Sequence, residues 1–301
     1  MVNQCMAIRD SNKLKVVEKK KHSIAIVIPT YNEILYLPNL LDALEHQTKP
    51  ADEIIIADAG SVDGTLELAV SRGVRVVQGG KPAVGRNAGA RLAKSDLLLF
   101  LDADVLPPPN FLAVLVNEFE QKNYDVATCY IEPLEKKYFY KILSFGTNMY
   151  IRAIQPLSPH APGFCILSKR ILHERIGGFN ERLLMSEDMD YVRRAKRYGK
   201  FGVLSEPTIP VSMRRVNKEG LIRLGLKYAW CEANVLTRKP IYRLPFQYEF
   251  GVFGLSQGNN PEISSRKANP FFNSFQGILF KKLSFVKYFH FIKGLFVDIE
   301  N

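Results

Sequence analysis

Short apolar runs alternate with helical stretches along the first half of this chain, and this rhythm restricts the fold more than any other feature of the sequence. The apolar runs predict strands over the ranges 24–28, 53–57, 74–78, 97–101 and 125–131. Between them, the spacing of apolar residues predicts one helix that begins at Pro38 and others over 64–70, 84–93 and 110–120. Buried strands joined by crossover helices are typical of an α/β fold, with a mostly parallel, Rossmann-like sheet flanked by helices.

The rhythm changes after residue 131. We expect further helices over 137–154, 187–198 and 220–236, and further strands over 163–167, 201–204 and 208–212. The sequence therefore divides into three parts: a basic, mobile lead-in over 1–22, a main domain over 23–215, and a helical, basic and aromatic C-terminal region over 216–301.

The charge is unevenly distributed along the chain. Its 41 Lys and Arg residues against 30 Asp and Glu give a net charge of +11, which usually indicates an anionic partner. However, the stretch 23–190 holds 16 basic and 21 acidic residues, whereas 191–265 holds 13 and five. A nucleic-acid groove over the whole protein is therefore not expected, and the basic remainder suits a diphosphate or an anionic lipid.

Cysteine usage and hydropathy indicate the compartment. The four cysteines, at 5, 129, 165 and 231, are scattered and form no CxxC motif, which fits a reducing environment. No apolar run approaches the roughly 18 residues that span a bilayer. We expect a cytoplasmic protein, either soluble or peripheral on the cytoplasmic face of a membrane.

Polar motifs follow four of the expected strands. They are PTYNE at 29–33, DAGSVDGT at 58–65, VGRNAGA at 84–90 and LFLDADV at 99–105. Each alone could be a turn or a helix cap. The carboxyl ends of parallel strands meet at one edge of the sheet, where ligands bind in such folds. Together, the four motifs favour a binding site at that edge.

The DAD motif carries two carboxylates. In an extended segment, Asp102 and Asp104 point the same way, and a cation would relieve their repulsion. Mg²⁺ or Mn²⁺ suits few carboxylates together with a substrate diphosphate. The alternative is an acidic turn before the three prolines at 107–109.

Two charged motifs lie further along the chain. SEDMD at 186–190 opens a helix, so Ser186 could be its cap and Asp188 could be a general base whose pKa the helix N-terminus holds low. Arg214 and Arg215 are either solvated charges at a strand end or a clamp on a leaving diphosphate.

These motifs, with GGFNERL at 177–183 and SEDMDYVRRAKRYG at 186–199, occur in an order that resembles the family 2 glycosyltransferases with the GT-A fold. The resemblance covers about two thirds of the chain. It implies that Asp188 is the catalytic base, that Asp104 and Asp102 hold a divalent cation, and that Gly163 and Glu187 border the acceptor side. It also implies a nucleotide-sugar pocket, whose residues would be Pro29, Thr30, Tyr31, Glu33, Asp58, Arg86, Asp102, Ala103, Arg214 and Arg215.

Two departures from the family pattern refine this expectation. Many relatives place a metal-binding His after the helix that carries the base, but 208–215 contains none, so a third protein ligand is not expected. The QxxRW motif of processive synthases is also missing, and the single tryptophan is Trp230. The resemblance therefore implies transfer of a single sugar rather than polymerisation.

The implied enzyme is a metal-dependent, inverting hexosyltransferase of glycan or cell-envelope biosynthesis. Its donor would be a UDP- or GDP-sugar, and its acceptor a glycan hydroxyl or a lipid-linked phosphate. The alternative is a catalytically silent GT-A protein that binds nucleotide-sugars or serves as a membrane scaffold. The aromatic and lysine-rich segment 271–297 could either lie on a membrane or pack on the protein.

Overall fold

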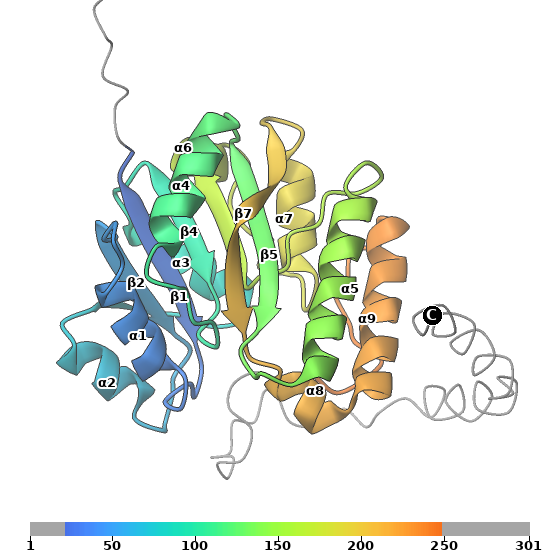
Figure 1. Cartoon of the computed structure of the whole chain (residues 1–301), viewed down its shortest axis with the longest axis horizontal. Helices are drawn as coiled ribbons and strands as arrows, with labels where there is room; N and C mark the ends of the chain where they lie inside the picture. The colour runs from blue at the N-terminus through green and yellow to red at the C-terminus, as the bar shows by residue number, and fades with distance from the viewer. Residues whose placement is uncertain (1–21, 249–301) are drawn as a thin grey trace, which may run out of the picture.

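The computed structural model describes residues 22–248, which form a seven-stranded sheet with helices on both faces (Figure 1). The strand order is β3-β2-β1-β4-β6-β5-β7. The strands are β1 (Ile24–Thr30), β2 (Glu53–Asp58), β3 (Arg75–Gln78), β4 (Leu97–Leu101), β5 (Val126–Pro133), β6 (Cys165–Lys169) and β7 (Phe201–Val211). Only β6 runs against the others, so the expected mostly parallel α/β sheet is confirmed.

The helices lie close to the expected ranges, with two additions. They are α1 (Leu37–Glu45), α2 (Thr65–Ser71), α3 (Pro82–Leu92), α4 (Phe111–Gln121), α5 (Tyr138–Ile154), α6 (Arg170–Arg175), α7 (Glu187–Ala195), α8 (Arg214–Glu219) and α9 (Leu221–Leu236). The sequence pattern did not predict α6 or α8, which have only six residues each and therefore too few turns to show a period.

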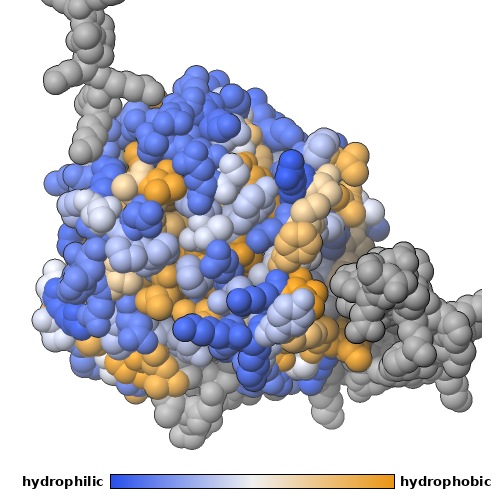
Figure 2. All heavy atoms as spheres, in the orientation of Figure 1, coloured by the Kyte–Doolittle hydropathy of each residue, from blue (hydrophilic) through white to orange (hydrophobic). Residues whose placement is uncertain are grey.

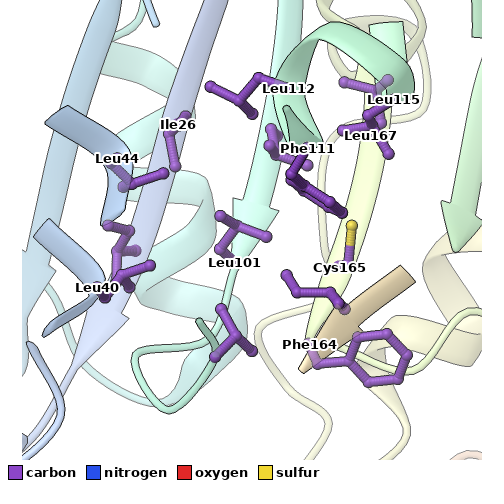
Figure 3. Close-up of a cluster of buried hydrophobic side chains, with 14 of the residues drawn as sticks. Ile26, Leu40, Leu44, Leu101, Phe111, Leu112, Leu115, Phe164, Cys165 and Leu167 are labelled. Atoms are coloured by element: carbon purple, nitrogen blue, oxygen red, sulfur yellow. The ribbon is translucent and has the colours of Figure 1, made fainter. Parts of the chain in front are cut away.

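Alternating side chains of β1 enter two separate cores, one on each face of the sheet. Ile24, Ile26 and Ile28 pack with α1 and α4, and this cluster is drawn in Figure 3. Ala25 and Val27 pack with α3 and α7 on the other face. Because both faces are covered, β1 and β4 are buried along nearly their whole length, as the continuous apolar runs predict.

Two details differ from the sequence-based expectations. The strands expected at 201–204 and 208–212 are one strand, β7, in which Leu204 pairs with Cys129 and Thr208 with Tyr130 across a bulge. The DAD segment is not extended, because β4 ends at Leu101 and a turn follows. The expected alternation of the two aspartates along a strand is therefore wrong.

Several expectations concern parts of the chain outside the described residues. These are the segment 271–297 and the lead-in 1–22, apart from His22 at its end. Within residues 22–248, no helix combines the length and the apolar character that crossing a membrane requires. The three cysteines of this part have free thiols and are buried.

Candidate active site

The turn that follows β4 is held between two arginines from distant parts of the chain. Arg86 of α3 donates to Asp102 Oδ1 over 2.9 Å, and Arg214 of α8 donates through Nε to Asp104 Oδ2 over 2.7 Å. The carboxyl ends of the parallel strands lie at one edge of the sheet, so the residues that follow them come together there. The end of β7 brings Arg214 to the same edge. The edge thus collects the charged motifs, as predicted.

The Arg214 cluster contains two carboxylates. The guanidinium forms a bidentate pair with Glu33, at 2.7 and 2.8 Å, in addition to its bond with Asp104, and it lies 4.7 Å from the ring centroid of Tyr36. Burial raises the pKa of Glu33 to about 7 although Arg214 opposes the shift. Burial and the charge of Asp102 also raise the pKa of Asp104, against the pull of Arg214.

The Arg86 cluster joins three segments of the chain. The Arg86 side chain is 3% exposed. In addition to its bond with Asp102, it donates to Glu187 Oε1 over 2.7 Å and to the Gly163 carbonyl over 3.3 Å. A Cβ on Gly163 would lie 2.4 Å from Arg86 Nη2, so glycine is required for this approach. The Nε of Arg86 is buried without a hydrogen-bond partner among the described residues.

Asp188 lies beside the Arg86 cluster. Its Oδ2 accepts the Gly163 amide over 2.8 Å, and its Oδ1 accepts the Met189 amide over 2.8 Å. Although the residue keeps some exposed surface, dense packing around the carboxyl raises its pKa to about 7, and the charge of Glu187 adds to the shift. The expectation of a low pKa is therefore wrong: desolvation outweighs the amides at the start of α7.

Ser186 precedes α7 but does not cap it with its side chain. It adopts the left-handed conformation, with φ of 60°, and makes no side-chain capping bond. Asp190, two residues after Asp188, pairs instead with Arg193 and Arg194. Two residues apart on a helix, Asp190 and Asp188 point to different sides of α7.

The Asp58 carboxylate organises the turn after β2. It accepts hydrogen bonds from the hydroxyls of Thr30 and Ser61 and from the amides of Gly60 and Ser61, at 2.6–3.0 Å. Asp58 is only 4% exposed. These bonds fix the shape of the turn beside β1, and the place of Asp58 in a nucleotide-sugar pocket stays a prediction.

The remaining predicted residues lie at the same edge of the sheet. Pro29 lies near the end of β1 and pairs with Ala57 of β2. Tyr31 follows β1, and Ala103 is buried in the DAD turn. Arg215 lies 4.7 Å from the ring centroid of Tyr248, and its charge opposes the rise in the pKa of Asp104. Arg214 and Arg215 are therefore not solvated strand-end charges.

Two carboxylates are available for a divalent cation. Each aspartate of the DAD turn gives one oxygen to an arginine, which leaves Asp102 Oδ2 and Asp104 Oδ1 as hard oxygen donors. Within the described part of the chain, no three His, Cys, Asp or Glu side chains come together to hold a metal ion. The two aspartates therefore fit an ion that a substrate diphosphate and water help to coordinate. Arg214, where the chain leaves β7, lies beside them.

The sequence pattern missed a second polar link, in the segment that leads to Gly163. His160 is buried in the segment before Gly163, and its Nε2 lies 3.0 Å from both carboxylate oxygens of Glu232 on α9. Its Nδ1 lies 3.0 Å from the Ser158 carbonyl. The link ties α9 to the segment that positions the Gly163 amide, and a lone histidine far from Glu232 in sequence gave no signal of it.

One cavity lies away from these residues. It has a volume of about 600 Å³ and is lined in part by Tyr130 of β5, Arg152 of α5 and Phe201 of β7. None of the predicted site residues lines it. The charged edge and this cavity are therefore separate features of the fold.

The chain is similar in sequence to known transferases. A family model described as "Glycosyl transferase family 2" matches residues 25–177. An undecaprenyl-phosphate 4-deoxy-4-formamido-L-arabinose transferase of Aeromonas hydrophila is 35% identical over 143 residues, which cover 43% of each chain. An O-antigen chain rhamnosyltransferase of Salmonella typhimurium is 28% identical over 240 residues, which cover 76% of this chain and 72% of the relative. The chain spans less than half the length of several curated relatives that it matches.

Solved structures share the fold. The mannosyltransferase PcManGT from Pyrobaculum calidifontis, in complex with GDP-Man and Mn²⁺, superposes with a TM-score of 0.54 at 21% identity. The superposition covers 70% of this chain and 65% of that one. The expected GT-A fold is thereby confirmed.

Proposed function

The chain belongs to glycosyl transferase family 2, and on this premise we propose that it is an inverting transferase that moves a single sugar from a nucleoside-diphosphate donor to an acceptor hydroxyl or lipid phosphate. The observation that carries this proposal is the position of Asp188. Its carboxyl has a pKa of about 7 and lies next to the Arg86 cluster that holds the DAD turn. A base poised near neutrality suits proton abstraction from an acceptor hydroxyl.

The donor would bind at the ends of β1, β2 and β4. The donor would be a UDP- or GDP-sugar, and Tyr31 and the turn that Asp58 organises would line the pocket for its nucleobase. Arg214 and Arg215 would bind the diphosphate, because guanidinium groups match phosphate oxygens in geometry and charge. The solved relative that carries GDP-Man and Mn²⁺ supports a donor of this class.

A divalent cation, Mn²⁺ or Mg²⁺, would be held by Asp102 and Asp104 together with that diphosphate. When bound, such an ion neutralises the charge that develops on the leaving group. The protein adds to this effect through Arg214 and Arg215, whose charges also favour ionised Asp104.

Transfer itself would be a direct displacement at the anomeric carbon. The acceptor oxygen forms a bond to that carbon while the bond to the diphosphate oxygen breaks, and Asp188 takes the hydroxyl proton. Single displacement inverts the anomeric configuration. Gly163 and Glu187 would border the acceptor, because Gly163 contacts Asp188 and Glu187 contacts Arg86.

The test is a screen of UDP- and GDP-sugars with and without Mn²⁺. We expect one donor to raise the melting temperature of the protein, and its nucleoside diphosphate to be released as an acceptor is glycosylated. NMR of the product should show the inverted anomer. If no donor changes the melting temperature, the proposal is wrong. Donor binding without transfer to any glycan or lipid-linked acceptor would support the catalytically silent alternative instead.

A further inference from the structure

The outward side of α5 carries an unusual apolar surface. It consists of Tyr138, Phe139, Ile142, Phe145, Met149 and Tyr150, which we call the α5 face. Their exposed fractions range from 43% to 77%. Apart from small residues, no other side chain lies between them on this side of the helix. A solvated helix normally presents charged residues outward, so this face is suited to contact with an apolar partner.

The rotation of α5 about its axis is fixed by contacts on its inner side. Asn148 exchanges two hydrogen bonds with the backbone of Ile131 in β5, at 2.8 and 3.0 Å. Tyr140 is buried and bonds to Asn217 of α8, and Ile151 is buried as well. The α5 face therefore cannot turn inward to join the core.

Basic residues flank the α5 face. Lys141 and Arg152 are exposed and, eleven residues apart, lie on the same side of the helix, while Lys136 and Lys137 precede its first turn. Tyrosines stand at both ends of the face. Aromatic and aliphatic residues with a basic flank are the composition of a helix that lies in the interface of an anionic membrane.

The α5 face begins near the candidate active site. In the same first turn of α5, the inward-facing Tyr140 bonds to Asn217, which lies on the same short helix as Arg214 and Arg215. Figure 1 places α5 and α9 side by side, and Figure 2 shows apolar residues gathered over this part of the visible surface. The start of α9 adds exposed Leu221 and Ile222.

We propose that the α5 face is a membrane-docking surface that seats the protein on an anionic lipid bilayer. A second copy of the chain fits less well, because two such faces in contact would bring their Lys141 and Arg152 flanks together, whereas anionic headgroups neutralise them. The benefit of docking rests on the proposed transferase function: it would bring the site close to an acceptor carried by a lipid.

The test is flotation of the full-length protein with phosphatidylglycerol vesicles and with phosphatidylcholine vesicles, in the absence of donor and acceptor. The wild type should bind the anionic vesicles preferentially. The double variant Ile142→Glu, Phe145→Glu should bind about 100-fold more weakly, since two apolar side chains no longer enter the lipid. Lys141→Gln should weaken binding to the anionic vesicles about fivefold.

Two matched variants make the test decisive. Val70→Glu, Ile171→Glu adds the same two carboxylates at exposed apolar positions of α2 and α6 and should bind like the wild type. Phe285→Glu, Phe289→Glu examines the C-terminal segment in the same full-length chain. The proposal is overturned if the α5 variant binds vesicles as the wild type does, or if only the C-terminal variant loses binding. It is also overturned if the wild type is a dimer that binds no vesicles and the α5 variant is a monomer. Because no donor enters the assay, its failure is distinct from failure of the proposed transfer.

Discussion

Arg86 and Arg214 bind the same turn through different aspartates, and their surroundings differ. Arg86 is nearly inaccessible and connects the DAD turn with Gly163 and Glu187, so it joins the proposed donor side to the proposed acceptor side. Arg214 is 12% exposed, belongs to a six-residue helix, and connects Glu33 with Asp104, both on the proposed donor side. We therefore expect Arg86 to determine how the two sides are held together, and Arg214 to determine how the donor is bound.

The largest expected effect is on the acceptor side of this comparison. Asp188→Asn keeps the size of the side chain but removes the base, so transfer should fall about 10²- to 10⁴-fold. Donor affinity should stay within about twofold of the wild type, because the base acts in the transition state rather than in donor binding. Single-turnover transfer and calorimetric donor binding measure the two quantities.

Asp190→Asn is the matched control for that variant. Asp190 lies on the same helix, points to a different side from Asp188, and pairs with Arg193 and Arg194. It should leave transfer nearly unchanged. Substantial turnover by Asp188→Asn, or an equal loss in both variants, would remove Asp188 from the role of base.

The second prediction compares the two arginines directly. Arg86→Met leaves the carboxylate of Glu187, which is 14% exposed, without its partner, and breaking this buried pair should lower the free energy of unfolding by about 3–5 kcal/mol. Arg214→Met should lower it less, because Glu33, whose pKa is already about 7, can take up a proton when the guanidinium is lost, but should weaken donor binding about tenfold or more. Urea denaturation and donor titration of both variants give the comparison. Equal losses in both assays would show that the arginines are equivalent.

The sequence predicts that the charged motifs meet at one edge of the sheet, but it does not predict which carboxylate pairs with which arginine. Parallel strands place their carboxyl ends together, so the motifs after β1, β2 and β4 had to meet there. Which carboxylate meets which arginine depends on the bulge in β7 and on the start of α8. Neither leaves a periodic signal in the sequence, so Glu33 and Arg214 could not be paired beforehand.

The pKa of Asp188 illustrates a second limit of sequence reasoning. Its place at the start of a helix predicts a lowered pKa, and that local effect is real. The opposing effect, dense packing and the neighbouring Glu187 charge, comes from the tertiary fold and is larger. The His160–Glu232 link is unpredictable for the same reason, because its members lie 72 positions apart.

Substitution of Gly163 disturbs the contacts of Arg86 without removing any charge. Gly163→Ala introduces a Cβ only 2.4 Å from Arg86 Nη2, so the guanidinium must move from Asp102 or Glu187. Overpacking of this kind should lower the free energy of unfolding by about 1–3 kcal/mol and reduce transfer. Gly146→Ala, where no atom of residues 22–248 lies within 4 Å of the added atom, should instead stabilise α5 by up to about 1 kcal/mol. Thermal melting of both proteins decides whether the position or the residue type matters.

The smallest expected effect is a shift in pH dependence. An ordinary aspartate has a pKa of about 3.9, and that of Asp188 is raised to about 7, so below that pH the carboxyl is protonated and cannot act as a base. We expect kcat/KM to rise about tenfold per pH unit up to about pH 7 and then to level off.

Glu187→Gln tests the cause of that shift. It removes a neighbouring negative charge and frees the positive charge of Arg86, and both changes favour ionised Asp188. The inflection of the kcat/KM profile should therefore move to lower pH, by up to about one unit. Asp190→Asn, whose charge is already paired with two arginines, should leave the inflection in place. An inflection that moves upward, or that moves equally in both variants, would mean that a group other than Asp188 controls the profile.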